Sequence, residues 1–273
     1  MNRGAAIQHG GVDAAEDVAL GALSVRRSFD RAGAGYDAVA VLQSDMRERL
    51  LQRLDSATEA PRVILDAGAG TGHASYALKR RYPQSRVIAV DSAFGMLRAA
   101  GREPWRGHFH RVCADAQHLP LANASVDLIL SNLMLQWCDR DAAFAEFRRV
   151  LAPGGCLRFT TLGPDTLREL RTAWASVDSD RHVNRFFDSH DWSAALVRAG
   201  FAAPLLEVVY CTLAYAEVRD LAADLKAIGA HTVTGRPKGL TGPRKFAAMQ
   251  EAYETFRRDG RLPATYEVIF GQA

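Results

Sequence analysis

Cysteine and long apolar runs are both scarce in this chain of 273 residues. The four cysteines stand far apart, and no two of them form a C-x-x-C pair. This spacing argues against a disulfide scaffold and a zinc knuckle, and it favours reduced thiols in a cytoplasmic protein. No uninterrupted run of about 18 apolar residues is present, so we expect no membrane-spanning helix.

The chain also lacks a large excess of positive or negative charge. The 34 Lys and Arg residues face 31 Asp and Glu residues, for a net charge of +3, and this balance gives no general nucleic-acid footprint. The first twenty residues lack the basic start and apolar core of a signal peptide. No H-E-x-x-H motif is present, so we expect no metal site. With 48% hydrophobic and 24% charged residues, the composition indicates a soluble globular protein.

The pattern of the chain changes twice near its start. Residues 1–17 are rich in Gly, Ala and Asp without periodicity, which predicts a loose tail. Residues 18–58 have helical periodicity broken near Gly33 and Gly35, which predicts a lid of paired helices. Residues 59–273 are expected to form the main domain.

In that main domain, short apolar runs alternate with helical segments. The runs predicted as strands are Arg62–Asp66, Arg86–Asp91, His108–Cys113, Val126–Ser131, Cys156–Thr161, Leu205–Leu213 and Thr265–Phe270. This alternation predicts an α/β fold with a parallel sheet covered by helices on both faces. Residues 214–264, between the last two runs, are interpreted as a helical insertion.

The most specific motif is Asp66–Gly72, with the letters D-A-G-A-G-T-G, between a strand and a helix. Glycine permits a tight turn and close approach of a ligand to the backbone. Asp91 ends the next strand, where a carboxylate can accept both hydroxyls of a ribose. The spacing differs from the G-x-G-x-x-G of NAD proteins, and Asp66 would repel a pyrophosphate. An ammonium group would be attracted, which favours S-adenosylmethionine.

Two later strand ends fit the same ligand. Asp115 follows the third strand and could accept the adenine amino group, and Asn132 with Leu133 ends the fourth beside the expected methyl donor. Together with Pro153-Gly154-Gly155, these residues resemble the class I S-adenosylmethionine-dependent methyltransferases. The resemblance implies a Rossmann-like, seven-stranded, mostly parallel sheet with an antiparallel last strand. The residues expected at the cofactor are Arg31, Asp66, Gly68, Gly70, Gly72, Asp91, Ser92, Met96, Asp115, Ala116, Asn132 and Leu133.

A narrower resemblance covers nearly the whole chain. Its motifs are Ser28–Ala32 with Tyr36-Asp37, Ser131–Leu133 with Gln136–Cys138, Phe159–Leu170, and Asp224–Ala230. They are similar to the malonyl-acyl-carrier-protein O-methyltransferase family of biotin synthesis. The resemblance implies methylation of the free malonyl carboxylate, giving an ester that passes through fatty-acid elongation as a primer. A methyltransferase for another small acid or a quinone precursor, and an assembly factor acting on a protein complex, remain alternatives.

Several residues are candidates for holding the substrate. A carboxylate is already ionised at neutral pH and needs no general base, only alignment and desolvation. Arg149 is the candidate cation for it, Trp137 the candidate wall of an acyl pocket, and Tyr36 the candidate lid residue. Met134 and Leu135 are larger than the resemblance leads us to expect, but neither is expected to touch the cofactor site.

The insertion also carries charge of one sign. Lys226, Arg236, Lys238, Arg244 and Lys245 lie in a stretch without acids. Because acyl carrier proteins are acidic, a basic patch beside the pocket would steer them to it. A solvated loop is the alternative, and RNA binding is disfavoured because no aromatic residues are interleaved to stack bases.

Overall fold

The computed structural model describes residues 24–32, 35–54, 60–101, 108–228 and 242–273. The predicted tail, residues 1–17, lies outside them. The strands in this part of the chain are β1 (Val63–Ala67), β2 (Arg86–Asp91), β3 (His110–Cys113), β4 (Val126–Asn132), β5 (Leu151–Leu162), β6 (Leu205–Tyr215) and β7 (Leu262–Gln272). They form one seven-stranded sheet in the order β3-β2-β1-β4-β5-β7-β6.

The direction of the strands confirms the predicted fold class. Strands β1 to β5 pair in parallel, and β7 runs antiparallel to both β5 and β6. The central strands β1 and β4 are almost entirely buried, as apolar parallel strands covered on both faces must be. The last strand in the chain is therefore antiparallel, as predicted, and it lies inside the sheet with β6 at the edge.

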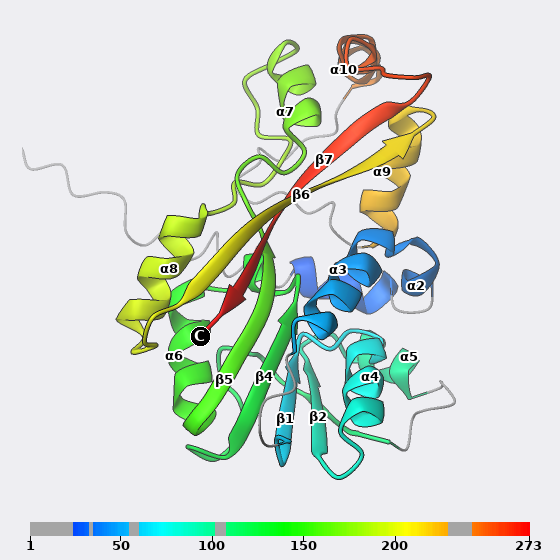
Figure 1. The fold of residues 1–273 in the computed structure, drawn as a ribbon. Coiled ribbons are helices and arrows are strands. Elements are labelled where there is room, and N and C mark those ends of the chain that lie inside the picture. The colour runs from blue at the N-terminus through cyan, green and yellow to red at the C-terminus, as the bar shows by residue number, and fades with distance from the viewer. Residues whose placement is uncertain (1–23, 33–34, 55–59, 102–107, 229–241) are drawn as a thin grey trace, which may run out of the picture.

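Helices cover both faces of this sheet (Figure 1). They are α2 (Tyr36–Val39), α3 (Val41–Gln52), α4 (His73–Arg81), α5 (Phe94–Ala100), the 3-10 turn η1 (Leu135–Trp137), α6 (Arg140–Val150), α7 (Arg168–Ala175), α8 (Ser189–Arg198), α9 (Val218–Ala227) and α10 (Pro243–Glu254). A further helix spans residues 24–32. Helices α3 and α4 pack into one apolar core, and α6 and α8 pack into the other. Among the described residues, no helix has the length and apolar character needed to cross a bilayer.

Strands β6 and β7 extend beyond the rest of the sheet. Pairing of β5 with β7 ends at Leu162 and Val268, whereas β6 and β7 stay paired as far as Tyr215 and Leu262. The extended part of this ribbon, together with α7, α9 and α10, forms a roof beyond the carboxyl ends of the parallel strands (Figure 1).

Three boundaries differ from the prediction. The lid consists of the helix at 24–32, α2 and α3 rather than one helical pair, because the chain also breaks at Ala40. Strand β5 begins at Leu151, since Pro153-Gly154-Gly155 is accommodated by a shift in register between β4 and β5 instead of ending an element. Strand β7 begins at Leu262, so the insertion between β6 and β7 is shorter than residues 214–264.

Candidate functional site

Three neighbouring cavities lie between the sheet, the lid helices and the roof, and Tyr36 lines all three. We name each after one lining residue. The Asp91 cavity has a volume of about 290 Å³, the Asp66 cavity about 120 Å³, and the His182 cavity about 200 Å³. Tyr36 therefore marks the place where the three cavities meet.

The glycine loop forms the floor between the Asp91 and Asp66 cavities. Gly70 has a φ of +55°, and a Cβ atom there would meet no atom within 4 Å, so its backbone faces open space. Gly68 has a φ of +77°, and a Cβ atom there would lie 2.3 Å from Cγ of Met134. A ligand can therefore approach the backbone closely at Gly70, whereas Met134 fills the space at Gly68.

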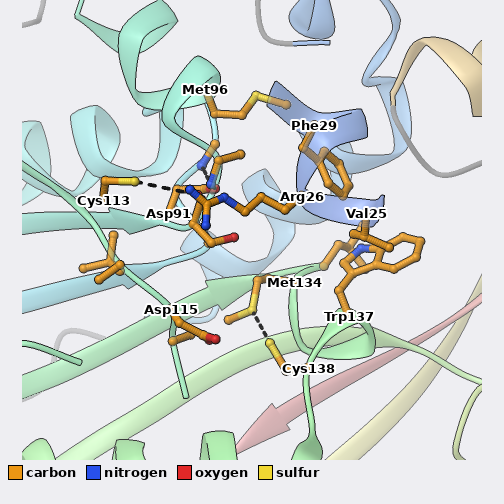
Figure 2. Close-up of a pocket in the computed structure, with 18 of the residues that line it drawn as sticks. Val25, Arg26, Phe29, Asp91, Met96, Cys113, Asp115, Met134, Trp137 and Cys138 are labelled. Carbon is orange, nitrogen blue, oxygen red and sulfur yellow. Dashed lines mark hydrogen bonds between the residues drawn. The ribbon is translucent and has the colours of Figure 1, made fainter. Parts of the chain in front are cut away.

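Asp91 is fixed at the wall of its cavity by two backbone groups. Its Oδ2 accepts a hydrogen bond from the Gly70 N–H at 2.8 Å, and its Oδ1 accepts one from the Ala93 N–H at 2.8 Å. Burial raises the pKa of this carboxyl above its ordinary value. Each oxygen retains a lone pair for a further donor, so the pair of hydroxyls on a ribose suits this position. Figure 2 shows Asp91 across the cavity from Phe29 and Trp137.

The cavities bring together most of the residues expected to hold the cofactor. Those that line the Asp91 or Asp66 cavity are Asp66, Gly68, Gly70, Asp91, Ser92, Met96, Asp115, Ala116, Asn132 and Leu133. Gly72 lines none of the three cavities; it precedes the first residue of α4 and turns the chain into that helix.

Asp66 is buried at the end of β1, where the Ser75 hydroxyl donates to its Oδ2 at 2.5 Å. Burial raises the pKa of Asp66 to about 6, and the hydrogen bond from Ser75 opposes that rise. Because burial makes the ionised form of this carboxyl costly, an arriving ammonium group would be favoured here.

Arg47 of α3 lines the same cavity and was not foreseen from the sequence. Its Nη2 donates to the Ser44 hydroxyl at 2.8 Å. Both residues belong to α3 and line the Asp66 cavity. An arginine opposite a buried aspartate suits both ends of an amino-acid zwitterion. The helical pattern of residues 41–52 gave no signal for it, because Arg47 looks there like any solvated position.

The lid is attached to the cofactor edge by two aspartates. Asp37 of α2 accepts from the Thr71 hydroxyl at 2.6 Å, and its other oxygen lies 3.2 Å from Nε2 of His73. Asp30 in the helix at 24–32 accepts from the Gly95 N–H at 2.8 Å. These contacts hold the lid helices directly over the glycine loop and α5.

Aromatic side chains separate the Asp91 cavity from the His182 cavity. Phe29, Tyr36 and Trp137 line both, together with Leu133, and Phe29 packs edge-on to Trp137 with ring centroids 5.8 Å apart. Burial raises the pKa of Tyr36, as do the nearby carboxylates of Asp91 and Asp37, so its phenol stays neutral and can donate a hydrogen bond. The passage between these cavities is thus apolar apart from one hydroxyl.

Met134 was expected to lie away from the cofactor site, and that expectation was wrong. Its side chain lines the Asp91 cavity and fills the space beside Gly68. Its sulfur lies 3.2 Å from Sγ of Cys138, as Figure 2 shows. The sequence could not show this contact, because it depends on how the chain turns after β4.

The structure does not bring two predicted arginines to the site. Arg31 is exposed, and its Nε donates to the Arg27 carbonyl at 3.2 Å. Arg149 lies on α6, where it pairs with Glu146 at 2.6 Å and donates to the carbonyls of Leu119 and Leu121. Neither lines any of the three cavities, and the donors of Arg149 are already engaged in tying a loop to α6. A substrate role for Arg149 and a cofactor role for Arg31 have no geometric support.

The basic segment is only partly within the described residues, because Arg236 and Lys238 fall in the gap at 229–241. Lys226 is exposed near the end of α9, and Arg244 is exposed at the start of α10. Lys245 is also exposed, but its Nζ forms an ion pair with Asp178 at 2.8 Å. Lys245 therefore has a structural partner that the sequence did not reveal.

Comparison with known proteins decides the family. Residues 65–159 match the family model described as a methyltransferase domain. The malonyl-acyl-carrier-protein O-methyltransferase of Methylovorus sp. (strain MP688) is 55% identical over 258 residues, covering 91% of this chain and 87% of that protein. The protein of the same name from Laribacter hongkongensis (strain HLHK9) is 50% identical, covering 91% and 88%. This chain belongs to the malonyl-acyl-carrier-protein O-methyltransferase family.

Solved structures agree with this family at the level of fold. The YcgJ protein of Bacillus subtilis superposes with a TM-score of 0.59 at 18% identity, covering 84% of this chain and 97% of that one. Geranyl diphosphate C-methyltransferase of Streptomyces coelicolor A3(2), solved with S-adenosyl-L-homocysteine, gives a TM-score of 0.51 at 17% identity, covering 84% and 75%. At such identities the likeness shows the methyltransferase fold.

Proposed function

We propose that this protein transfers a methyl group from S-adenosylmethionine to the free carboxylate of malonyl-acyl carrier protein. The observation that carries the proposal is the position of Tyr36, at the meeting point of two cavities with cofactor-type residues and a third cavity under the roof. High identity to named family members over nine-tenths of the chain supports the substrate.

The residues present fit the cofactor. Asp91 would hold the ribose hydroxyls, Asp115 the adenine, and Asp66 with Arg47 the amino-acid end, because these groups complement its hydroxyls, amine and zwitterion. S-adenosylmethionine, when bound, supplies an electrophilic methyl group. The chain supplies the pocket that orients it.

The chain needs no general base for this reaction. A malonyl carboxylate is ionised at neutral pH, well above a carboxyl pKa of about 4. Phe29, Leu133 and Trp137 exclude water between the cavities, which raises the reactivity of the carboxylate by removing its hydration. The neutral Tyr36 hydroxyl can donate to one carboxylate oxygen and leave the other directed at the methyl group.

Docking of the carrier protein is proposed on the basic segment. Ala222 and Leu225 of α9 and Ile228, directly after this helix, line the His182 cavity, and Lys226 is exposed on the same helix. Arg244 lies in the first turn of α10, in the same roof. A positive surface beside the cavity would draw an acidic carrier protein to it and deliver the acyl arm.

The direct test uses purified protein, S-adenosylmethionine and malonyl-acyl carrier protein. We expect the acyl group to gain one methylene in mass, and acetyl-acyl carrier protein, which has no free carboxylate, to gain nothing. Rescue of a biotin auxotroph that lacks this step is the matching test in cells, as expected of an enzyme that makes the ester primer of biotin synthesis.

Each alternative gives a different result. Cofactor binding with methylation of another small acid or a quinone precursor, but not of the malonyl group, would replace this proposal with that substrate. Cofactor binding without methylation or rescue would favour an assembly factor that acts on a protein complex.

A further inference from the structure

The His182 cavity has few groups that can recognise a negative charge. Among the described residues that line it, no lysine or arginine is present, and His182 is the one side chain that can become cationic near neutral pH. The other polar side chains include the amides of Gln43 and Gln136 and the phenol of Tyr266. Arg26 and Arg47 line the Asp91 and Asp66 cavities instead, so His182 is the candidate partner for an anionic substrate within this cavity.

His182 is held rigidly by two neighbours. Its Nε2 lies 2.8 Å from Oδ1 of Asp178, and its ring stacks on Trp174 with centroids 3.7 Å apart and planes 5° from parallel. Its side chain is 4% exposed. A planar stack on indole also stabilises a positive charge on the ring. A histidine restrained in this way keeps one orientation toward the cavity wall.

The partner of His182 fixes which ring nitrogen carries hydrogen. Lys245 holds the pKa of Asp178 down to about 2, and His182 contributes to the same effect. Asp178 is therefore ionised and can only accept, so Nε2 must donate to it. In a neutral ring Nδ1 would then be a bare acceptor that repels a carboxylate. In the protonated ring Nδ1 donates, and a carboxylate is attracted.

We propose that protonated His182 binds the free carboxylate of the malonyl group and selects acidic acyl groups over uncharged ones. The inference rests on the proposed function and adds the residue that recognises the negative charge of the substrate. The charged and titratable groups near His182 include Asp178, Asp180 and Arg181 on its own segment. Lys245 of α10 lies 2.8 Å and 3.9 Å from the two acids, and Tyr266 of β7 lines the same cavity. Lys245 already balances one negative charge of the acidic pair.

The experiment compares wild type with His182→Gln, which keeps a donor for Asp178 but cannot become charged. His190→Gln, an exposed histidine of α8, is the matched control. Steady-state kinetics with malonyl-acyl carrier protein are measured from about pH 5.5 to 8.5, a range that spans the ordinary titration of histidine. We expect KM for His182→Gln to rise about 10- to 100-fold at the acidic end, as loss of a charged hydrogen bond predicts. The value of kcat should change little.

The pH profile separates substrate binding from a structural role. With S-adenosylmethionine kept saturating at every pH, the wild-type KM should rise with pH, that of His182→Gln should not, and that of His190→Gln should match wild type. Asp178→Asn keeps an acceptor for Nε2 but removes the negative charge, so its rise in KM should begin at lower pH. Melting temperature and cofactor affinity, measured in parallel, should match wild type and show that these variants are folded.

Two failures are distinguishable. An unchanged KM and a wild-type pH profile in His182→Gln would overturn the role of His182 while leaving methylation intact. If wild type binds the cofactor but does not methylate malonyl-acyl carrier protein, the proposed function fails, and this inference fails with it.

Discussion

The hydroxyl of Thr71 donates to the carboxylate of Asp37 at 2.6 Å, and this bond joins the glycine loop to the lid. The other oxygen of Asp37 lies 3.2 Å from Nε2 of His73, at the start of α4. The two elements that enclose the cofactor edge therefore share one carboxylate. The bond joins residues 34 positions apart in the sequence.

Asp37→Asn should loosen this lid. We expect the dissociation constant for S-adenosylmethionine to rise about 3- to 10-fold, the effect of weakening one charged hydrogen bond. Calorimetric titration measures it, with Asp45→Asn on α3 as control because Asp45 pairs with Arg49 of the same helix. Equal affinity in the two variants would show that the lid closes without Asp37.

The lid bond also predicts a pH limit. Burial raises the pKa of Asp37, but the hydrogen bonds from His73 and Thr71 outweigh burial, and the net pKa is lowered. A lowered carboxyl pKa contributes stability at neutral pH that is lost as pH falls through the folded-state value. Proteolysis of the lid should therefore stay slow until the pH drops below the ordinary range of aspartate.

The raised pKa of Asp66 leads us to expect that cofactor binding depends on pH. Burial raises its pKa to about 6, so in the free protein it takes up a proton below that pH. An ammonium group binds the ionised form, so binding must expel that proton, and affinity should fall about tenfold per pH unit below pH 6. Calorimetry from pH 5 to 7.5 in two buffers of different ionisation enthalpy measures the proton released. Asp66→Asn should bind more weakly and lose this slope; a wild-type affinity that does not vary with pH would contradict the assignment.

Asp91→Ala should weaken cofactor binding by about 10- to 100-fold, because it removes the acceptor for the ribose and also the bond that fixes Gly70. Asp91→Asn keeps the shape and one acceptor oxygen, so we expect an intermediate loss. Equilibrium dialysis with labelled cofactor separates the three proteins. Equal affinity in all of them would move the ribose away from Asp91.

Arg149→Gln tests the reassignment of this arginine. Loss of its bonds to Glu146 and to the Leu119 and Leu121 carbonyls should lower the free energy of unfolding by about 1–3 kcal/mol. Urea unfolding measures it against Arg148→Gln, an exposed neighbour on α6. A large rise in KM for malonyl-acyl carrier protein without loss of stability would return Arg149 to the substrate.

Reversing the charge of Arg244 and Lys226 tests whether the carrier protein docks on the basic segment. Arg244→Glu combined with Lys226→Glu should raise KM for malonyl-acyl carrier protein, and added salt should reduce the difference from wild type because exposed charges are screened. Arg86→Glu, at the start of β2 and far from the roof, is the control. Lys245 is left intact because its ion pair with Asp178 would confuse docking with the state of His182. A doubly reversed protein with wild-type KM at low salt would contradict docking at α9 and α10.

The sheet, the glycine loop and the ends of the strands could all be predicted from local sequence pattern. Buried parallel strands are continuous apolar runs, and Asp66, Asp91 and Asn132 follow such runs directly, so local pattern was enough to place them at one edge. The family followed from the same local motifs, because their residues and spacing are written in the chain itself.

Which polar side chains reach the cavities depends on the packing of distant segments. Arg47 comes from the lid and His182 from the segment after α7, and neither has a neighbour in sequence that reveals its partner. Arg149 has the charge expected of a substrate residue, but the packing of α6 turns it toward the Leu119–Asn123 loop. Such directions depend on contacts between distant segments, and a helical or alternating pattern of residues does not contain them.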